Sequence, residues 1–348
     1  MTLLPMPVFT PSLFRVGCML FWTYASAQGQ AFDHPAVADS ATGALFIAQA
    51  TLVQVRTDSI EIGCSSSQPP VDMLMVPDTL TRSTRRLRTG LLLSSSVLSL
   101  GATYVYLEKK WWSEGYTNFH LDDGRDFRYA SNIDKFGHLL GGIFTADVYY
   151  GGFRWAGMSK HRAEWYAVGA TAFVQLSIEF KDGFSPRYGF SWADVTVGTL
   201  GGFWPMLQNH APFFRDSQVK FSYWQRTTKY FDQRGIKTQA FSIDDYINQA
   251  YWFSFSLKYL FGPSLKQKWP DWLQFSVGVG LDAATWSPTR NGEGGLWEVY
   301  LAPDINLVKL FKPGKPWVKS VLHVLNYIKV PMPTLQIAPR PRLWGLYF

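Results

Sequence analysis

The feature that most constrains this fold is a change in hydrophobic pattern near residue 215. Before it, three segments of helical length are rich in glycine and alanine, which let helices pack closely: 133–156, 161–181 and 191–208. After it, apolar residues tend to occupy every second position, which is typical of half-buried antiparallel strands. The sequence therefore predicts an α+β protein, with a helical bundle at residues 85–210 and an antiparallel β region at residues 211–348.

The β region contains several separate runs. The clearest is 272–283, where one strand face carries Leu273, Phe275, Val277, Val279 and Leu281. Further strands are expected at 219–227, 296–307 and 334–348, and helices at 244–262 and 316–328. The chain ends on alternating aromatic residues with Phe348 last, a pattern found in outer-membrane barrels. A small outer-membrane β-barrel with a helical insert is therefore the alternative fold.

Residues 1–27 have the pattern of a secretory signal peptide. Arg15 provides the positive charge, a short apolar run follows, and Ala25-Ser26-Ala27 is a suitable cleavage site. Residues 28–84 lack periodicity and are rich in serine, alanine and threonine. We expect a low-complexity, partly disordered linker there, with a short strand at 50–56.

Residues 89–107 form an apolar segment that carries no charge over 19 positions. By length this segment is a transmembrane candidate. If it spanned the inner membrane, the arginines of 82–88 would lie outside, against the usual charge bias. We therefore expect it to be a buried helix in a bundle of about four helices. The arginine-rich run is either a solvated helix start or a contact site for anionic lipid head groups or lipopolysaccharide phosphates.

The composition favours a membrane-associated protein of the cell envelope. Aromatic residues and charged residues each make up 17% of the chain, whereas typical soluble domains carry about 25% charged residues. The net charge is +7, but an exported protein is not expected to bind nucleic acid. Of the two cysteines, one lies in the signal segment, so neither a disulfide within the mature chain nor a cysteine metal site is expected.

Six titratable residues of the helical half are expected to converge. They stand at three helix ends: Asp134, Lys135 and His138 at one, Glu179 and Asp182 at the next, and Asp194 at the third. The first two helices are joined by a short connection, so they should be antiparallel, and the start of one should lie beside the end of the other. The sequence therefore predicts a polar cluster at one end of the bundle.

This cluster has three interpretations. As a catalytic site, it would use His138 as base or nucleophile, with Asp134 orienting the ring and Lys135 binding an anionic group. Glu179 or Asp194 would then be the second acid–base group. As a metal site, it would hold a hard cation through carboxylates and one imidazole, but the spacing matches no strong metal motif and no cofactor is expected. As a structural network, it would only fix the register of the helices.

These residues resemble the YfiM-like predicted periplasmic lipoproteins, a family of unknown function. The shared patterns are DKxGH, ExxDG and GxSxxD, which fall on Asp134, Lys135, Gly137 and His138, on Glu179, Asp182 and Gly183, and on Gly189, Ser191 and Asp194. The resemblance covers roughly residues 90–348 and implies an envelope protein, with a lipid anchor in some members. A weaker similarity to VanZ-like helical membrane proteins places Gly198 where those patterns commonly have asparagine.

The sequence as a whole predicts an exported cell-envelope protein, at the outer membrane or on the periplasmic face of the envelope. We expect a membrane-associated structural or interaction component, with a lipid or lipopolysaccharide surface and other envelope proteins as partners. The alternative is a membrane-surface enzyme that acts on lipid or cell-wall substrates through His138 and its acidic neighbours.

Overall fold

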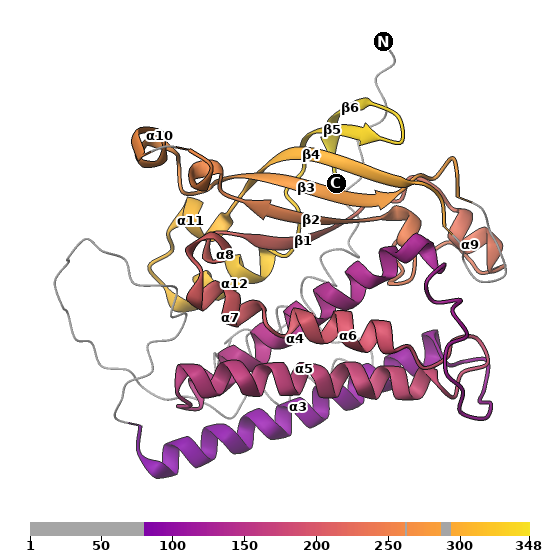
Figure 1. The fold of residues 1–348 in the computed structure, drawn as a ribbon. Coiled ribbons are helices and arrows are strands. Elements are labelled where there is room, and N and C mark those ends of the chain that lie inside the picture. Colours follow the sequence, from indigo (N-terminus) through magenta and orange to yellow (C-terminus); the bar gives the residue numbers. More distant parts are fainter. Residues whose placement is uncertain (1–79, 262, 287–293) are drawn as a thin grey trace, which may run out of the picture.

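The computed structural model describes residues 80–261, 263–286 and 294–348. The expected signal peptide, nearly all of the expected linker and its strand at 50–56 lie outside these residues. Helices form one layer and an antiparallel sheet the other (Figure 1). The fold is α+β, as the change of pattern near residue 215 predicted.

The first half of the described chain is helical. Its helices are α3 (Arg82–Lys110), α4 (Ile133–Trp155), α5 (Lys160–Asp182), α6 (Trp192–Gly201), α7 (Trp204–His210) and α8 (Pro212–Arg215). Helix α4 packs against α3, α5, α6 and α7, and in Figure 1 it runs between the sheet and the outer helices α3 and α5. The expected helices at 133–156 and 161–181 match α4 and α5 closely.

Two expectations for the helical half were wrong. The helix expected at 191–208 is divided, because α6 ends at Gly201 and Pro205 stands in the first turn of a separate α7, where its missing N–H does no harm. The helix expected to be buried at 89–107 is part of the longer α3, and only 11% of its apolar window is buried. Among the described residues, α3 is the one helix long and apolar enough to cross a membrane.

Six strands follow, in chain order across the sheet and each antiparallel to the next. They are β1 (Gln218–Tyr223), β2 (Gln249–Phe255), β3 (Leu273–Leu281), β4 (Trp297–Ile305), β5 (Met332–Ala338) and β6 (Arg342–Tyr347). The short helices of this half are α9 (Lys229–Gln233), α10 (Pro263–Lys268), α11 (Leu307–Phe311) and α12 (Pro316–Leu325). Helix α12 agrees with the expected helix at 316–328. The sheet is open, with β1 and β6 at its edges, so the alternative of a small barrel is not confirmed.

The prediction of a helix at 244–262 was wrong. Its centre is strand β2, which lies between one-turn 3₁₀ helices at Tyr246–Asn248 and Leu257–Tyr259. Side chains on both faces of β2 are buried, so its sequence reads as a continuous apolar run rather than as an alternation. Such a run is compatible with either a strand or a buried helix.

The sheet buries its more polar face. In β3, Gln274 and Ser276 are almost fully buried, whereas Val277, from the apolar face expected at 272–283, is 37% exposed. The aromatic rings of Trp252 in β2 and Tyr347 in β6 meet across the buried face, with centroids 5.8 Å apart. Three strands separate β2 from β6, so this contact requires the sheet to curl around its polar face.

Helices α4 and α6 cross with their backbones in contact. A Cβ atom on Gly142 of α4 would lie 1.9 Å from the carbonyl oxygen of Gly198 in α6. A Cβ atom on Gly198 would lie 2.3 Å from the side chain of Gln175 in α5. Only glycine fits at such a crossing. The close approach holds the start of α6, with Asp194, beside the first turns of α4.

Candidate functional site

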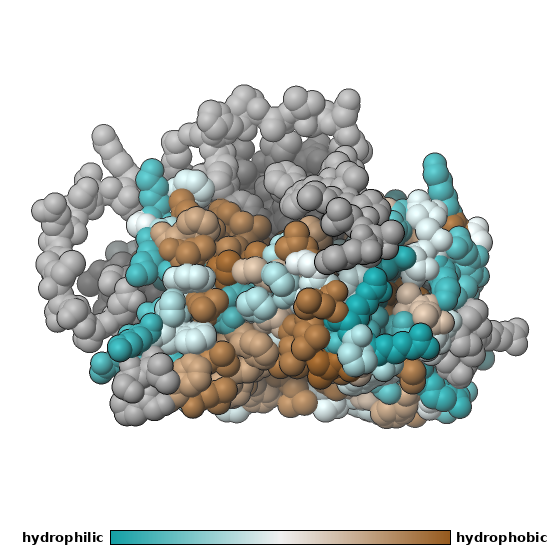
Figure 2. Space-filling model, turned by 90° about the horizontal axis from the view of Figure 1, so that it is seen from above, coloured by the Kyte–Doolittle hydropathy of each residue, from teal (hydrophilic) through white to brown (hydrophobic). Residues whose placement is uncertain are grey.

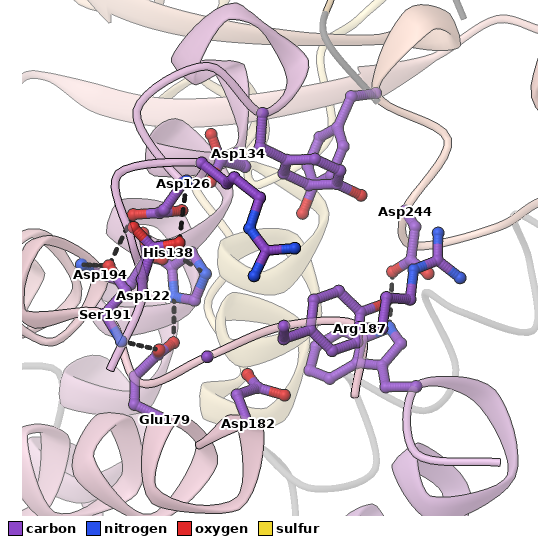
Figure 3. Close-up of a pocket in the computed structure, with 16 residues that line it drawn as sticks. Asp122, Asp126, Asp134, His138, Glu179, Asp182, Arg187, Ser191, Asp194 and Asp244 are labelled. Carbon is purple, nitrogen blue, oxygen red and sulfur yellow. Dashed lines mark hydrogen bonds and ion pairs between the residues drawn. The ribbon is translucent and has the colours of Figure 1, made fainter. Parts of the chain in front are cut away.

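A pocket opens where the start of α4, the end of α5 and the start of α6 meet (Figure 3). Seven carboxylates line it: Asp122, Asp126, Asp134, Glu179, Asp182, Asp194 and Asp244. His138 and two arginines, Arg125 and Arg187, also line it. We call this the acidic pocket.

The chain enters α4 through a strained turn. Ala130, Ser131 and Asn132 have φ values of 47°, 49° and 65°, in the left-handed region that costs about 1–2 kcal/mol for each such residue. Two hydrogen bonds from the sheet side hold this turn. The Ser131 hydroxyl donates to the carbonyl of Gly295, and Trp297 Nε1 donates to the carbonyl of Ser131, both at 2.8 Å. The turn sets the direction in which α4 presents its first side chains.

Lys135 is surrounded by three aspartates from three parts of the chain. Its ammonium lies 2.6 Å from Asp126 Oδ1, 2.9 Å from Asp134 Oδ2 and 2.7 Å from Asp194 Oδ1. The other carboxylate oxygen of Asp126 accepts a hydrogen bond of 2.6 Å from the Ser191 hydroxyl. One cation, with a side chain that is 12% exposed, therefore joins the loop before α4, α4 itself and α6.

The imidazole of His138 lies between acids from two other helices. Its Nδ1 is 3.9 Å from Glu179 Oε1 in α5, and its Nε2 is 3.7 Å from Asp194 Oδ1 in α6. Gln175 Oε1 lies 3.3 Å from Nδ1. The His138 side chain is 20% exposed, whereas that of Glu179 is 3% exposed. The ring can therefore be reached from the pocket, and the carboxylates behind it restrain its orientation.

Two further acids of the acidic pocket, Asp182 and Asp244, bond to tryptophans that follow α3. Trp112 Nε1 donates to Asp182 Oδ1 at 2.6 Å, and Trp111 Nε1 donates to Asp244 Oδ1 at 2.5 Å. Arg234 lies 3.5 Å from the other oxygen of Asp244. These contacts join the end of α3 to the pocket wall.

Burial and mutual repulsion raise the pKa values of several acids in this pocket. Burial raises the pKa of Asp134 to about 8, that of Asp182 to about 7 and that of Glu179 to about 10. Repulsion from Asp182 and Asp194 adds to the shift at Glu179. Although burial opposes it, the Lys135 ammonium lowers the pKa of Asp126. At neutral pH the pocket therefore holds protonated and ionised carboxyl groups side by side, an arrangement suited to proton transfer.

Two sets of side chains have the spacing needed to hold a cation. They are His138, Glu179 and Asp194, and Asp126, Asp134 and Asp194, each set with donor atoms within 4.8 Å of one another. The Lys135 ammonium contacts all three acids of the second set and so takes the place of a cation there. The first set, which combines one imidazole with carboxylates, would suit a hard or borderline divalent ion.

The structure brings all six predicted residues to this place, but two roles differ from those expected. Asp134 pairs with Lys135 and makes no contact that orients His138; Glu179 and Asp194 flank the ring instead. Lys135 is held by three aspartates and is not available to bind an anionic group. Asp182 lines the pocket and bonds to Trp112 rather than to the imidazole.

Sequence reasoning missed Asp126, which lies in the loop between α3 and α4. This loop pairs with the segment before α6, because Phe190 N donates to the carbonyl of His120 at 3.1 Å and Asp122 N donates to the carbonyl of Phe190 at 3.0 Å. That pairing places Asp126 in contact with Lys135 and Ser191. The acidic run "LDDGRD" is the only local signal, and it does not indicate which helix the loop will meet.

No protein-family model, curated protein or solved structure matches this chain. The resemblance to YfiM-like proteins, and the location and function that it implies, therefore stay predictions.

Proposed function

We propose that the protein is an exported cell-envelope component that rests on a membrane, at the outer membrane or its periplasmic side, through the outer faces of its helical bundle. The observation that carries this proposal is the reversed polarity of α5. Its buried side includes five polar residues, namely Glu164, Thr171, Gln175, Glu179 and Asp182. Its outward side includes Trp165, Tyr166, Phe173, Leu176 and Phe180, between 39% and 65% exposed. A helix in water normally places its apolar side inward, so this pattern favours lipid outside α5.

Helices α3 and α6 add to the apolar surface. Their exposed side chains include Leu93, Val97, Leu98 and Val105 on α3, and Trp192 and Leu200 on α6. In Figure 1, α3 and α5 lie on the side of the molecule away from the sheet. Apolar surface of this extent on a monomer supports contact with a membrane or another protein.

Charges at the ends of α3 favour a membrane. Arg82, Arg85 and Arg86 are exposed in its first turns, and Lys109 is exposed near its last. Long basic side chains at the ends of an apolar segment can reach lipid head groups, and a cluster of arginines attracts anionic lipids. The helix therefore combines an apolar length with basic ends, as interfacial helices do.

The sheet offers a second apolar surface, and it supplies a matched control. Figure 2, seen from above, shows several groups of hydrophobic side chains among polar ones. Leu335, Ile337 and Leu343 of β5 and β6 are among the exposed apolar residues of the sheet, at 42%, 45% and 75%. The proposal assigns the membrane to the helical face and not to this one.

Vesicle flotation tests the proposal. A chain with Val97→Glu and Phe173→Glu should bind anionic vesicles about tenfold more weakly than the wild type, because each change buries a charge in lipid. The control chain, with Leu335→Glu and Ile337→Glu, should bind like the wild type. Loss of binding in the control alone would assign the membrane to the sheet, and equal binding by all three chains would refute membrane contact through either face.

A second candidate function is supported by the geometry of His138. Its ring is accessible and is flanked by Glu179, with a raised pKa, and by Asp194. This arrangement supports acid–base chemistry on a lipid or cell-wall substrate. Chains with His138→Gln or Glu179→Gln that keep the wild-type Tm but lose an envelope phenotype would favour the enzyme. Chains that fail to accumulate would favour a structural network.

A further inference from the structure

A second pocket lies at the opposite end of α4 from the acidic pocket. Residues from α4, α7, α8, α11 and α12 line it. Its charged side chains are four cations and one carboxylate, namely Arg154, Arg215, Lys309, Lys319 and Asp147, with His323 beside them. We call it the basic pocket.

The carboxylate of the basic pocket is already engaged. His323 Nε2 lies 2.5 Å from Asp147 Oδ2, and the Tyr327 hydroxyl donates to the same oxygen at 3.1 Å. One of the cations, Lys309, also has a partner, because it pairs with Asp216, which Lys258 shares. The pairs within this pocket therefore leave none of its lining carboxylates for Arg215 or Lys319.

Two of those cations stand out. Among the described residues, neither Arg215 nor Lys319 forms an ion pair, and the buried Nε of Arg215 donates to no acceptor. Burial lowers the pKa of Lys319, with no acid opposing the shift. A buried donor without an acceptor costs about 1–3 kcal/mol. The pocket thus holds two positive charges and a buried N–H group that an anionic ligand would satisfy.

We propose that the basic pocket binds a phosphate group. A phosphate carries up to two negative charges and directs oxygens toward several sides, which matches a guanidinium on α8 and an ammonium on α12 that face one cavity. A carboxylate would balance one of these charges only. The group is either a free phosphate or the head group of a phospholipid. The inference does not depend on the membrane contact of α3 and α5.

The test measures binding to the purified full-length chain. Inorganic phosphate and pyrophosphate are titrated against sodium chloride at the same ionic strength, with Tm as the readout, because a ligand of the folded state raises Tm. In parallel, flotation compares phosphatidylcholine vesicles with and without phosphatidic acid. The main variant is Lys319→Gln. The control is Lys315→Gln, which removes an exposed charge at the start of the same helix and outside the pocket.

The proposal expects phosphate or phosphatidic acid to bind the wild type and Lys315→Gln equally, and Lys319→Gln about tenfold more weakly. A Tm response to phosphate and pyrophosphate assigns a free phosphate, and selective flotation with phosphatidic acid alone assigns a head group. Arg215→Lys, which keeps the charge but loses the planar fork, should also weaken binding. Equal affinities for wild type and Lys319→Gln, or a response to chloride as large as that to phosphate, would overturn it.

Discussion

The two ends of helix α4 carry pockets of opposite charge, and they differ in how that charge is compensated. At its start, seven carboxylates surround the acidic pocket, and Lys135, bound protons and tryptophan N–H groups compensate them from within the chain. The other end of the helix is about 30 Å away, at 1.5 Å per residue. There the basic pocket holds Arg215 and Lys319, neither of which pairs with an acid among the described residues. The excess of negative charge is therefore compensated within the fold, whereas the excess of positive charge is the basis for the proposed phosphate site.

The largest expected effect comes from removing the cation of the acidic pocket. Lys135→Met should lower the free energy of unfolding by about 3–5 kcal/mol, because three aspartates then lose their shared partner. Lys319→Met, at the other end, should change it by less than about 0.5 kcal/mol, because no described acid depends on that ammonium. Urea denaturation measures both. Similar losses for the two variants would remove the distinction between the pockets.

A smaller loss is expected where α4 and α6 touch. Gly142→Val should destabilise the fold by about 3 kcal/mol, because its side chain would overlap the carbonyl oxygen of Gly198. The control is Gly169→Ala in α5, where a Cβ meets nothing within 4 Å. Because alanine favours helices more than glycine does, this control should stabilise the protein by up to about 1 kcal/mol. A tolerated valine at 142 would mean that the helices do not cross this closely.

The smallest expected effects concern the dependence of stability on pH. Groups of the acidic pocket and of the basic pocket should change stability in opposite directions as pH rises. Burial raises the pKa of Asp182 from 3.8 to about 7 in the folded protein. Between these values the folded protein holds a proton that the unfolded chain has released, so stability falls as pH rises through this range. Asp134 and Glu179, with raised pKa values, act in the same direction. The Tm of Asp182→Asn should therefore fall less than the Tm of the wild type as pH rises from about 5 to about 8.

Lys319 should make the stability of the protein rise with pH, opposite to the effect of Asp182. Burial lowers its pKa in the folded protein from the ordinary 10.5. Between the lowered value and the ordinary one, the unfolded chain holds a proton that the folded protein lacks, so this residue adds stability as pH rises. Lys319→Gln should therefore show a steeper loss of Tm toward alkaline pH than the wild type. A shallower loss would contradict the assignment of an uncompensated lysine.

Patterns within one segment predicted helices α4, α5 and α12 and the six site residues that stand on helices. The glycine and alanine content of α4 and α5 and the spacing of their charges placed His138 beside Glu179 and Asp194, because these features depend on helix geometry alone. Asp126 could not be found this way, because a loop reaches its partner through long-range packing.

Burial was harder to predict than secondary structure. Helix α3 has the length and apolar content of a buried helix, yet it lies largely exposed, since composition does not reveal what packs on a helix. Strand β2 was read as a helix because both its faces are apolar enough to be buried. The polar inner face of the sheet, with Gln274 and Ser276, reverses the usual alternation.

Quenching by brominated lipids would measure whether the outer helices contact a lipid bilayer. A fluorescent probe would be attached through Phe173→Cys on α5 or through Leu335→Cys on β5, in chains whose Cys18 and Cys64 are replaced by serine. The helical-face contact predicts strong quenching at position 173 and little at position 335. Quenching at 335 but not at 173, or at neither position, would contradict it.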